Sequence, residues 1–279
     1  MSYADEVFKR TALNIINNGV SDNGQIVRPH WEDGTPAHTI KKFGVCNTFD
    51  LQKEFPATTV RPVALKSCLD EILWIWQKQT SDVSKLNSHI WDSWKQEDGT
   101  IKKAYGYQFS KKYKFPQGEM TQVDDVLWQI KNTPMSRRMQ TSIYNYEDLH
   151  DMPLYPCFWG TMWDVDIENG LLNLTVLSRS NDYLVAGMGW NPCQYALLLM
   201  MFAQTTGYKP GIMNVYINNC HIYDRHIPIV KELIERPTYD APIVKLNPDI
   251  KNFYDFTVDD LIVENYQKNP QVKDIPVAV

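Results

Sequence analysis

The sequence predicts an α+β fold in which helices pack on a largely β core. Residues 171–179 and 213–217 alternate apolar and polar side chains, as strands with one buried face do. Residues 192–206 are apolar nearly all round, which is typical of a helix buried at the centre of a domain. Strands with one covered face and a buried helix together favour helices layered on a sheet.

The chain is expected to form one domain over residues 1–279. Its length suits one large domain or two small ones, but it contains no repeat, no low-complexity tract and no linker rich in proline, glycine or serine. The content of 43% apolar and 22% charged residues excludes a disordered, collagen-like or coiled-coil chain.

The first clear element is a helix expected at residues 62–78, where Leu65, Leu69 and Ile72 recur at helical spacing. Glu71 lies beside this apolar stripe, so its carboxylate sits at the edge of apolar surface. Because burial disfavours the charged form of a carboxylate, we expect a raised pKa for Glu71.

Two further helical patterns occupy residues 81–94 and 122–131. The second is expected to end before Pro134, because proline lacks a backbone donor and restricts the residue before it. The buried helix is expected to open with Pro192 and to close at Gly207.

Charge, hydropathy and cysteine content exclude several classes of protein. The formal net charge of -5 gives no basic footprint for a nucleic acid. The longest apolar run, residues 195–203, is shorter than the roughly 20 residues that cross a bilayer, and residues 1–6 do not resemble a secretory signal, so we expect a cytoplasmic protein that does not contact membranes. Five cysteines without metal-type spacing predict neither a disulfide framework nor a metal site.

Cys157 precedes an expected strand and has two interpretations. A free cysteine is most often a small buried hydrophobic residue. As a nucleophile it requires a cationic neighbour, because an ordinary thiol has a pKa of about 8.5 and only the thiolate attacks. Arg179 is the candidate for that neighbour.

Arginines and a histidine motif suggest a site for a phosphorylated sugar. Arg137 and Arg138 are either a solvated turn or part of an anion site, since guanidinium groups pair with phosphate oxygens. Arg179 follows a strand, and three arginines suit one phosphomonoester. His221 and Tyr223 point to the same side of an extended chain, either as structural residues or as a pair that binds a sugar hydroxyl.

A series of short motifs in fixed order resembles the thymidylate synthase family over nearly the whole chain. Each motif is weak alone, but their joint order is highly specific. They are Asp-Gly-Thr-Pro-Ala-His-Thr (33–39), Glu-Ile-Leu-Trp (71–74), Ile-Trp-Asp-Ser-Trp (90–94), Ala-Tyr-Gly (104–106), Ser-Arg-Arg (136–138), Tyr-Pro-Cys (155–157), Arg-Ser-Asn-Asp (179–182), Trp-Asn (190–191), His-Ile-Tyr (221–223) and Pro-Val-Ala-Val (276–279).

The resemblance implies a homodimer that assembles through the sheet and transfers one carbon from 5,10-methylenetetrahydrofolate, its co-substrate, to C5 of a pyrimidine nucleotide. Cys157 would add to C6 of the ring and so make C5 nucleophilic. Arg179 and Ser180 would hold the phosphate, with Arg137 and Arg138 contributed by the partner subunit. The residues implied for the sugar 3′-hydroxyl are His221 and Tyr223.

The same resemblance assigns three further side chains to the chemistry. Glu71 would organise proton transfer, and Tyr105 would take part in removing the C5 proton. The Asn191 amide would donate to O4 and accept from N3-H of uracil. The residues implied to position and cover the folate are Trp91, Trp94, Asp182 and Val279.

Several residues depart from the wording typical of the family. The stretch 183–191 is one residue longer and lacks Leu-Gly-x-Pro-Phe-Asn. Ser178 stands in place of glutamine, and Phe158 in place of histidine. Residues 218–219 are Asn-Asn in place of a small residue and aspartate, and Gly34 takes the place of an N-terminal phosphate-binding arginine. These departures surround one pocket and suggest an altered substrate or outcome.

Three outcomes therefore stay open, with thymidylate synthesis from dUMP as the main expectation. Trp91 and the terminal 276–279 motif favour it, because both would shield the reacting carbon from water while hydride is delivered. The alternative is a 5-hydroxymethylase acting on CMP, dCMP or dUMP, which the altered loop and Asn218-Asn219 favour. An inactive RNA-binding or regulatory homologue is the third, although the acidic balance and the joint presence of Cys157, Glu71 and Asn191 argue against it.

Overall fold

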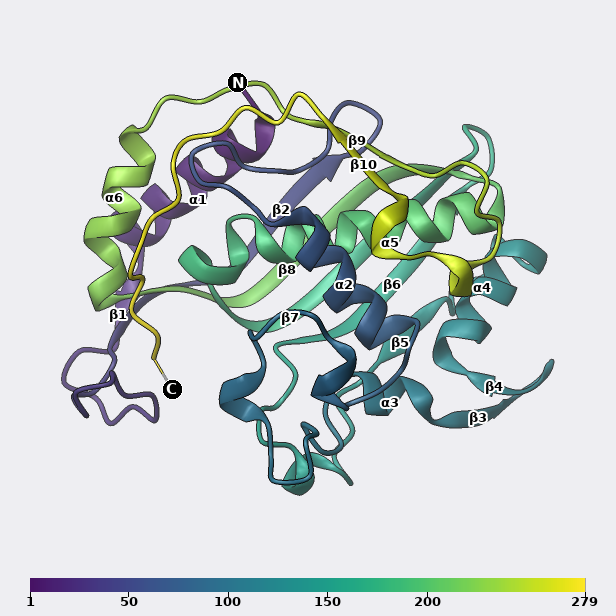
Figure 1. Cartoon of the computed structure of the whole chain (residues 1–279), viewed down its shortest axis with the longest axis horizontal. Coiled ribbons are helices and arrows are strands. Elements are labelled where there is room, and N and C mark those ends of the chain that lie inside the picture. Colours follow the sequence, from purple (N-terminus) through teal and green to yellow (C-terminus); the bar gives the residue numbers. More distant parts are fainter. Residues whose placement is uncertain (279) are drawn as a thin grey trace.

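A six-stranded mixed sheet forms the centre of the computed structural model, which describes residues 1–278 (Figure 1). The strand order is β1-β2-β8-β7-β6-β5, and only β7 and β8 run parallel to each other. The bounds are β1 Val20–Ser21, β2 Thr39–Asp50, β5 Gln140–Ser142, β6 Phe158–Asp166, β7 Leu171–Asp182 and β8 Lys209–Tyr223.

The register of β7 and β8 brings two sequence motifs to one edge of the sheet. Ser180 lies opposite Asn219, and Asp182 lies opposite His221. Because the strands are parallel, their carboxyl ends meet at the same edge. The arginine motif at 179–182 and the histidine motif at 221–223 are therefore neighbours in space.

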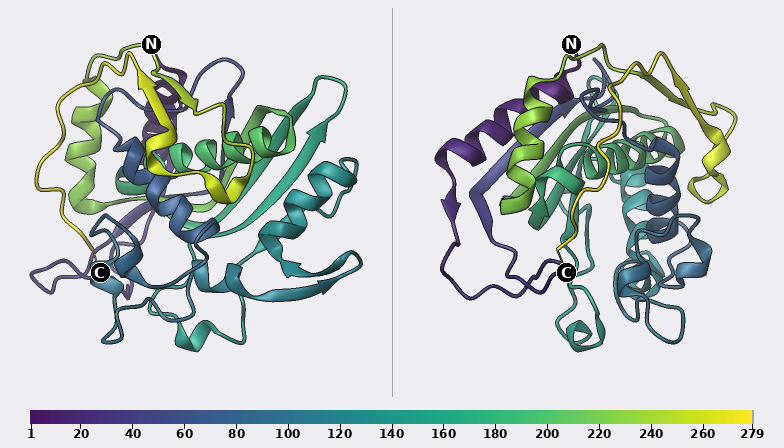
Figure 2. Two further views of the ribbon diagram at one scale, coloured as in Figure 1. Left: turned by 45° about the vertical axis from the view of Figure 1, so that its right-hand side comes forward. Right: turned by 60° about the vertical axis from the view of Figure 1, so that its left-hand side comes forward.

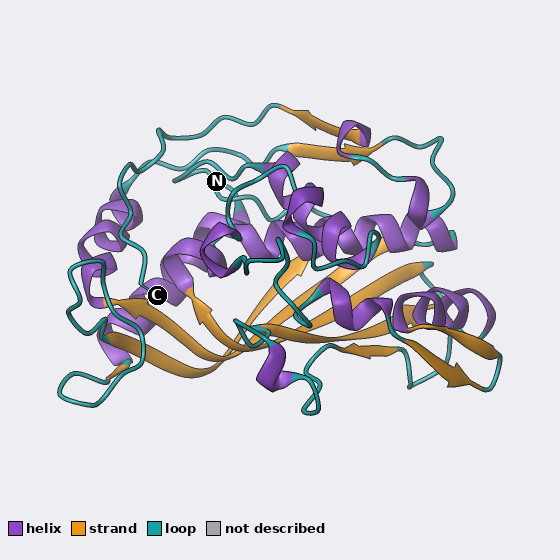
Figure 3. Cartoon of the chain, turned by 60° about the horizontal axis from the view of Figure 1, so that its bottom comes forward, coloured by secondary structure: helices purple, strands orange, loops and turns teal. Residues whose placement is uncertain are grey.

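The long helices are stacked on one side of the sheet (Figure 3). Helix α5 (Trp190–Thr206) contacts β7 and β8, and α2 (Leu65–Trp76) packs on α5. Helices α1 (Tyr3–Asn18) and α6 (Ile227–Glu235) cover the end of the sheet near β2. The α+β class, the packing of helices on a β core and the buried central helix match the sequence prediction.

Aromatic side chains join this helical layer to the sheet. The ring of Phe202 on α5 stacks on Trp163 of β6, with centroids 4.5 Å apart, and meets Trp76 of α2 edge-on at 6.0 Å. All three rings are buried, and aromatic pairs of this geometry add about 0.5–1.5 kcal/mol to the gain from burial alone. The position of α2, which carries Glu71, is thus set by packing against α5.

The expected bounds of the strands and helices need small corrections. Helix α5 begins at Trp190 rather than at Pro192, and it ends at Gly207, whose φ of 85° only glycine adopts freely. Helix α4 (Gln122–Asn132) lies where it was expected. Strands β7 and β8 both run further than their alternating cores indicated, and β8 includes His221 and Tyr223.

The prediction of a helix at residues 81–94 is wrong. Only two short 3-10 turns form there, η1 (Val83–Lys85) and η2 (Asp92–Trp94). The backbone N–H of Ser84 donates to the Asp82 carboxylate at 2.9 Å, and that of Asn87 donates to the Asp70 carboxylate at 2.8 Å. These side-chain acceptors satisfy donors that a helix would have paired with its own carbonyl groups.

The sequence patterns did not indicate α1, β2 or α6, nor the smaller elements, whereas β6 is the strand expected after Cys157. The remaining helices and strands are α3 Gly106–Ser110, β3 Lys112–Phe115, β4 Gly118–Thr121, η3 Leu149–Asp151, η4 Tyr183–Gly187, η5 Asp224–His226, β9 Ile243–Leu246, η6 Phe253–Asp255, η7 Val258–Asp260 and β10 Leu261–Glu264.

The C-terminal segment runs over the helices and ends far from β9 and β10 (Figures 1 and 2). Arg236 donates to the carbonyl oxygen of Pro270 at 2.7 Å, and Nε2 of His226 lies 2.8 Å from the carbonyl oxygen of Pro276. These contacts bring the segment to the edge of the sheet where the two motifs meet.

Residues 1–278, the described part of the chain, include all five cysteines. In this part of the chain no helix combines the length and the apolar composition that a bilayer crossing requires. All five cysteines are unpaired. The described residues contain no group of three or more His, Cys, Asp or Glu side chains placed to hold a metal ion.

Candidate active site

Cys157 lies at the start of β6, beside the Arg179 guanidinium. The Arg179 side chain donates to the carbonyl oxygens of Tyr155 at 2.8 Å and Pro156 at 3.0 Å, and Nη2 lies 3.7 Å from Sγ of Cys157. The backbone N–H of Arg179 also donates to the carbonyl of Cys157 at 2.9 Å. One arginine therefore fixes the turn that carries the thiol and supplies the cationic neighbour expected from the sequence.

Burial and charge act on the Cys157 thiol in opposite directions. Burial raises its pKa, and the positive charges of Arg179 and Arg28 oppose this rise only in part, so the pKa of the free thiol stays raised. Arg28 belongs to the loop between β1 and β2, and its charge also reaches Tyr223. Sequence reasoning missed Arg28 and noted only Gly34 in place of an N-terminal arginine. No local pattern marks Arg28, because only the fold brings this loop to Cys157.

Tyr105 lies against the backbone of Cys157. Its phenolic oxygen accepts the N–H of Cys157 at 3.1 Å, and its φ of 46° is a strained value for a bulky residue. Burial raises the pKa of Tyr105, so the phenol keeps its proton and acts as a hydroxyl rather than as a phenolate. Strain held in place at such a position is typical of functional sites.

Glu71 is buried on α2, and an indole N–H donates to each oxygen of its carboxylate. Nε1 of Trp91 lies 3.0 Å from Oε1, and Nε1 of Trp190 lies 2.7 Å from Oε2. Burial raises the pKa of Glu71 to about 7, while the two indole hydrogen bonds oppose the rise. The raised pKa agrees with the sequence prediction and suits a group that both gives and takes a proton near neutral pH.

Trp91 connects Glu71 to Tyr105 and Trp94. The Trp91 ring meets the Tyr105 ring at 4.8 Å and the Trp94 ring at 5.6 Å, both edge-on. The stretch 81–94 is thus not a helix, but it still delivers both of its predicted tryptophans to this region.

Asn191, the second residue of α5, belongs to a row of side-chain amides. Its Oδ1 accepts from Nδ2 of Asn181 at 3.0 Å, and its Nδ2 donates to Oε1 of Gln194 at 2.9 Å. Gln194 in turn lowers the pKa of Glu71. The side chain expected to recognise the base is therefore held on both sides by neighbouring amides.

The longer stretch at 183–191 folds as a π-helical turn, η4. The N–H of Met188 donates to the carbonyl of Tyr183 at 2.9 Å, a span of five residues that takes up one residue more than an α-turn. Asp182 caps this turn by accepting from Leu184 and Val185. A Cβ at Gly187 would collide with the Asn181 side chain, so the turn requires glycine there.

His221 and Tyr223 face the same edge, with perpendicular rings 5.1 Å apart. Nδ1 of His221 lies 3.2 Å from Oδ1 of Asn219, which only accepts, so the ring proton is on Nδ1 and Nε2 is left as an acceptor. Burial lowers the pKa of His221 and raises that of Tyr223 to about 12, so both side chains are neutral near pH 7.

Three of the predicted binding residues do not gather at Cys157 within the described chain. Arg137 and Arg138 are exposed between α4 and β5, and no hydrogen bond or ion pair in residues 1–278 joins them to Cys157. Asp182 lies 3.5 Å from Nδ1 of His226, the residue that contacts the C-terminal segment. Val279 lies outside the described residues.

A cavity of about 340 Å³ lies beside Trp190 and the C-terminal segment. Its walls are mostly apolar, with one guanidinium. The lining residues are Arg61, Pro62, Val63, Ala64, Val185, Trp190, Gln271, Val272, Ile275 and Val277. Trp190 thus contacts this cavity and Glu71 at the same time.

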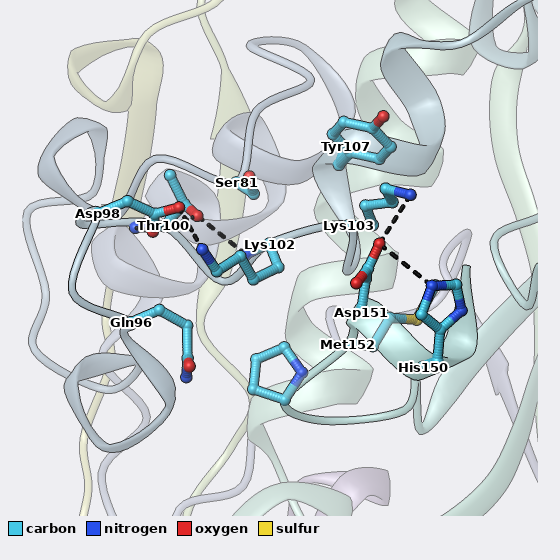
Figure 4. A pocket seen from close by; sticks show the side chains of 11 residues that line it. Ser81, Gln96, Asp98, Thr100, Lys102, Lys103, Tyr107, His150, Asp151 and Met152 are labelled. Atoms are coloured by element: carbon cyan, nitrogen blue, oxygen red, sulfur yellow. Dashed lines mark hydrogen bonds and ion pairs between the residues drawn. The ribbon is translucent and has the colours of Figure 1, made fainter.

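The larger cavity of about 700 Å³ lies elsewhere (Figure 4). The charges that line it neutralise one another, because Lys102 pairs with Asp98 at 2.5 Å and Lys103 pairs with Asp151 at 2.7 Å. We therefore assign the chemistry to the smaller cavity and the adjoining edge of the sheet.

Comparisons with known proteins identify the family and the fold. A family model described as thymidylate synthase matches residues 6–279. Thymidylate synthase of Bacillus phage phi3T and thymidylate synthase 1 of Bacillus subtilis strain 168 are each 45% identical over 272 residues, which is 96% of this chain and 96% of theirs. The solved structure of thermostable thymidylate synthase A from Bacillus subtilis superposes with a TM-score of 0.93 at 43% identity and covers 99% of both chains.

Proposed function

The chain belongs to the thymidylate synthase family, and we propose that it converts dUMP to dTMP with 5,10-methylenetetrahydrofolate at the site around Cys157. One observation supports the assignment of residues to this reaction. Sγ of Cys157, the Arg179 guanidinium and the phenol of Tyr105 meet at the sheet edge that also bears Ser180 and His221. A nucleophile, an anion site and a sugar site thus converge in one place.

The nucleotide is held so that its ring faces the sulfur. Arg179, Arg28 and Ser180 bind the phosphate, while Nε2 of His221 and the Tyr223 hydroxyl bind the 3′-hydroxyl. Cys157 then adds to C6 of uracil, and the electron pair of the C5–C6 double bond moves toward O4 and makes C5 nucleophilic. The arginine charges favour the thiolate against the effect of burial.

Three side chains recognise the base and transfer its protons: Glu71, Asn191 and Tyr105. The Asn191 amide reads O4 and N3-H, which suits uracil. Glu71, with a pKa of about 7, exchanges a proton with the nucleobase region, and Tyr105 takes part in removing the proton from C5. The cysteine leaves C6 once C5 carries the new methyl group.

The residues present around the smaller cavity fit a reduced folate. Val185, Trp190 and Val277 give apolar walls for flat rings, and Arg61 lies at the cavity to meet a carboxylate. Trp91, Trp94 and Asp182 adjoin them, and the proposed role of Val279 is to close the tail over the site. The folate supplies the methylene carbon and then the hydride, and it leaves as dihydrofolate.

The hydroxymethylase alternative gains no support. The relatives described above carry the name thymidylate synthase. Trp91 is buried against Glu71, and His226 holds the C-terminal segment at Pro276, so both features that would exclude water from the reacting carbon are present.

We also propose a homodimer that assembles through the face of the sheet opposite the helices. Met162 of β6 and Phe43 of β2 are large apolar side chains with 48% and 78% of their surface exposed. Arg137 and Arg138 would reach the partner's phosphate site, which explains their exposure in one chain. A cytoplasmic location fits five unpaired cysteines.

The overall function is tested by mixing the protein with dUMP and 5,10-methylenetetrahydrofolate. We expect one dTMP for each dihydrofolate formed. Ultraviolet absorbance measures the dihydrofolate, and mass spectrometry identifies the nucleotide product. CMP and dCMP are expected to give neither product. A 5-hydroxymethyl nucleotide formed without dihydrofolate would overturn the proposal.

If each active site takes Arg137 and Arg138 from the partner subunit, two inactive variants should regain activity when their subunits are mixed. Cys157→Ala and the double variant Arg137→Ala with Arg138→Ala should each be nearly inactive. After subunit exchange half of the dimers are mixed, and each mixed dimer holds one intact site, so about a quarter of wild-type turnover should return. Differently tagged chains show that mixed dimers form; if they form and no activity returns, the arginines do not act across the interface.

A further inference from the structure

We propose that Trp190 is a positioning residue for Glu71: its indole N–H holds one carboxylate oxygen while its ring closes one side of the folate cavity. The inference rests on the function proposed above. The family wording has phenylalanine before the asparagine, and a phenyl ring has no N–H to offer. In this chain Nε1 of Trp190 lies 2.7 Å from Oε2 of Glu71, a short distance typical of a charge-assisted hydrogen bond.

Two tryptophans from different parts of the fold hold the two carboxylate oxygens. Trp91 comes from the non-helical stretch beside η2 and binds Oε1, while Trp190 begins α5 and binds Oε2. A carboxylate held at both oxygens cannot rotate without losing one of these bonds. Each indole therefore contributes to the direction in which Glu71 faces the substrates.

The backbone around Trp190 is fixed by close packing. The π-helical turn at 183–187 precedes it, and a Cβ at Gly189 would lie 2.7 Å from a methyl carbon of Val63. The thiol of Cys68 lies 3.8 Å from the carbonyl oxygen of Trp190. Cys68 is one turn before Glu71 on α2, so a side-chain contact also joins the helix that carries Glu71 to the backbone of Trp190.

The charge environment makes these N–H donors important. The titratable groups that act on Glu71 or are acted on by it are Asp70, Cys68, Tyr105 and Tyr195. None of these is a cation, and Asp70 further disfavours the ionised carboxylate. In the described residues, the influences that favour the ionised form are the side-chain hydrogen bonds from Trp190, Trp91 and Gln194.

Trp190→Phe separates the hydrogen bond from the wall of the cavity. With the N–H lost and the ring kept, we expect the acid limb of the kcat profile to move up by about 1 pH unit, with the KM for the folate within about twofold of wild type. Trp190→Ala removes both features and should raise that KM by about tenfold as well. Trp128→Phe, at a partly exposed position on α4 that the site does not use, should match wild type.

A direct titration tests the contact without turnover. Infrared difference spectra against pH report the Glu71 carboxyl, which is identified as the band that Glu71→Gln lacks. Its midpoint should rise by about 1 unit in Trp190→Phe. An unchanged midpoint would overturn the role of Trp190, even with an active wild type. A wild type inactive on dUMP would instead overturn the proposed function and leave this titration as a test of the contact.

Discussion

Cys157→Ser is expected to lower kcat/KM for dUMP by about 10⁴-fold or more. A serine hydroxyl is far less acidic than a thiol, so a thiol yields its anion much more readily than serine does, even where burial raises the thiol pKa as it does at Cys157. Arg179, 3.7 Å from the sulfur, can favour a thiolate but cannot produce an alkoxide. The hydroxyl fits the same space, so the loss reports on chemistry rather than on folding.

The covalent step is visible by mass spectrometry. A nucleotide with fluorine at C5 cannot lose that substituent as a cation, so it should trap the adduct on the peptide that contains Cys157. Cys46→Ser, at an exposed cysteine on β2, is the matched control and should form the adduct as wild type does. Full turnover by Cys157→Ser, or an adduct on a different peptide, would contradict the mechanism.

The parts of the fold that sequence predicted best are those in which pattern and burial agree. Helix α2 keeps one apolar stripe against α5, and α5 is apolar all round because it is surrounded by the sheet and by α2. The stretch 81–94 shows the limit of such reasoning. Its apolar side chains have helical spacing, yet Asp70 and Asp82 capture backbone N–H groups that a helix would have paired.

Some residues of the candidate site could be predicted from local sequence, and others could not. Short motifs identified Cys157, Glu71 and Asn191, because each lies in a recognisable string of residues. Arg28 was not predicted, because its role depends on a loop that folds back to the sheet edge. No local sequence pattern indicates that arrangement. The hydrogen bond from Trp190 to Glu71 was equally invisible, since it joins residues 119 positions apart.

Other departures from the family wording have local structural explanations. Phe158 stacks on Tyr195 of α5, with centroids 5.2 Å apart, so an apolar ring fills that place in the core. The Ser178 hydroxyl donates to the carbonyl of Ser180 at 3.0 Å and so supports the end of β7. Asn219 holds the ring of His221. These contacts show that the substituted side chains have structural partners of their own.

Glu71→Gln is expected to reduce kcat by about 10²–10⁴-fold, the range typical of a lost proton-transfer group. Glutamine keeps the size of the side chain and one acceptor oxygen, but it cannot exchange a proton. The pH profile should also change, because the step near the Glu71 pKa of about 7 belongs to this carboxyl. Steady-state kinetics between pH 5 and 9 measure both effects, and a variant that keeps the wild-type profile would exclude Glu71 from proton transfer.

The same substitution should flatten the pH dependence of stability. The folded pKa of Glu71 is about 7, above the ordinary value of 4.5, so between these pH values the folded protein binds a proton that the unfolded chain has lost. The free energy of unfolding therefore falls as pH rises through this window, by about 3 kcal/mol from this group alone.

Urea unfolding at pH 5 and pH 8 isolates this contribution. One indole N–H loses its acceptor in Glu71→Gln, which shifts stability by a similar amount at both pH values and so cancels in the difference. Asp5 and His226 titrate alike in both proteins and also cancel. The wild type should lose about 2.5 kcal/mol more than the variant between the two pH values, because part of the Glu71 titration in the unfolded chain lies below pH 5. Parallel curves would mean that Glu71 is not held in a buried, protonated state, and the same desolvation could then not tune it for catalysis.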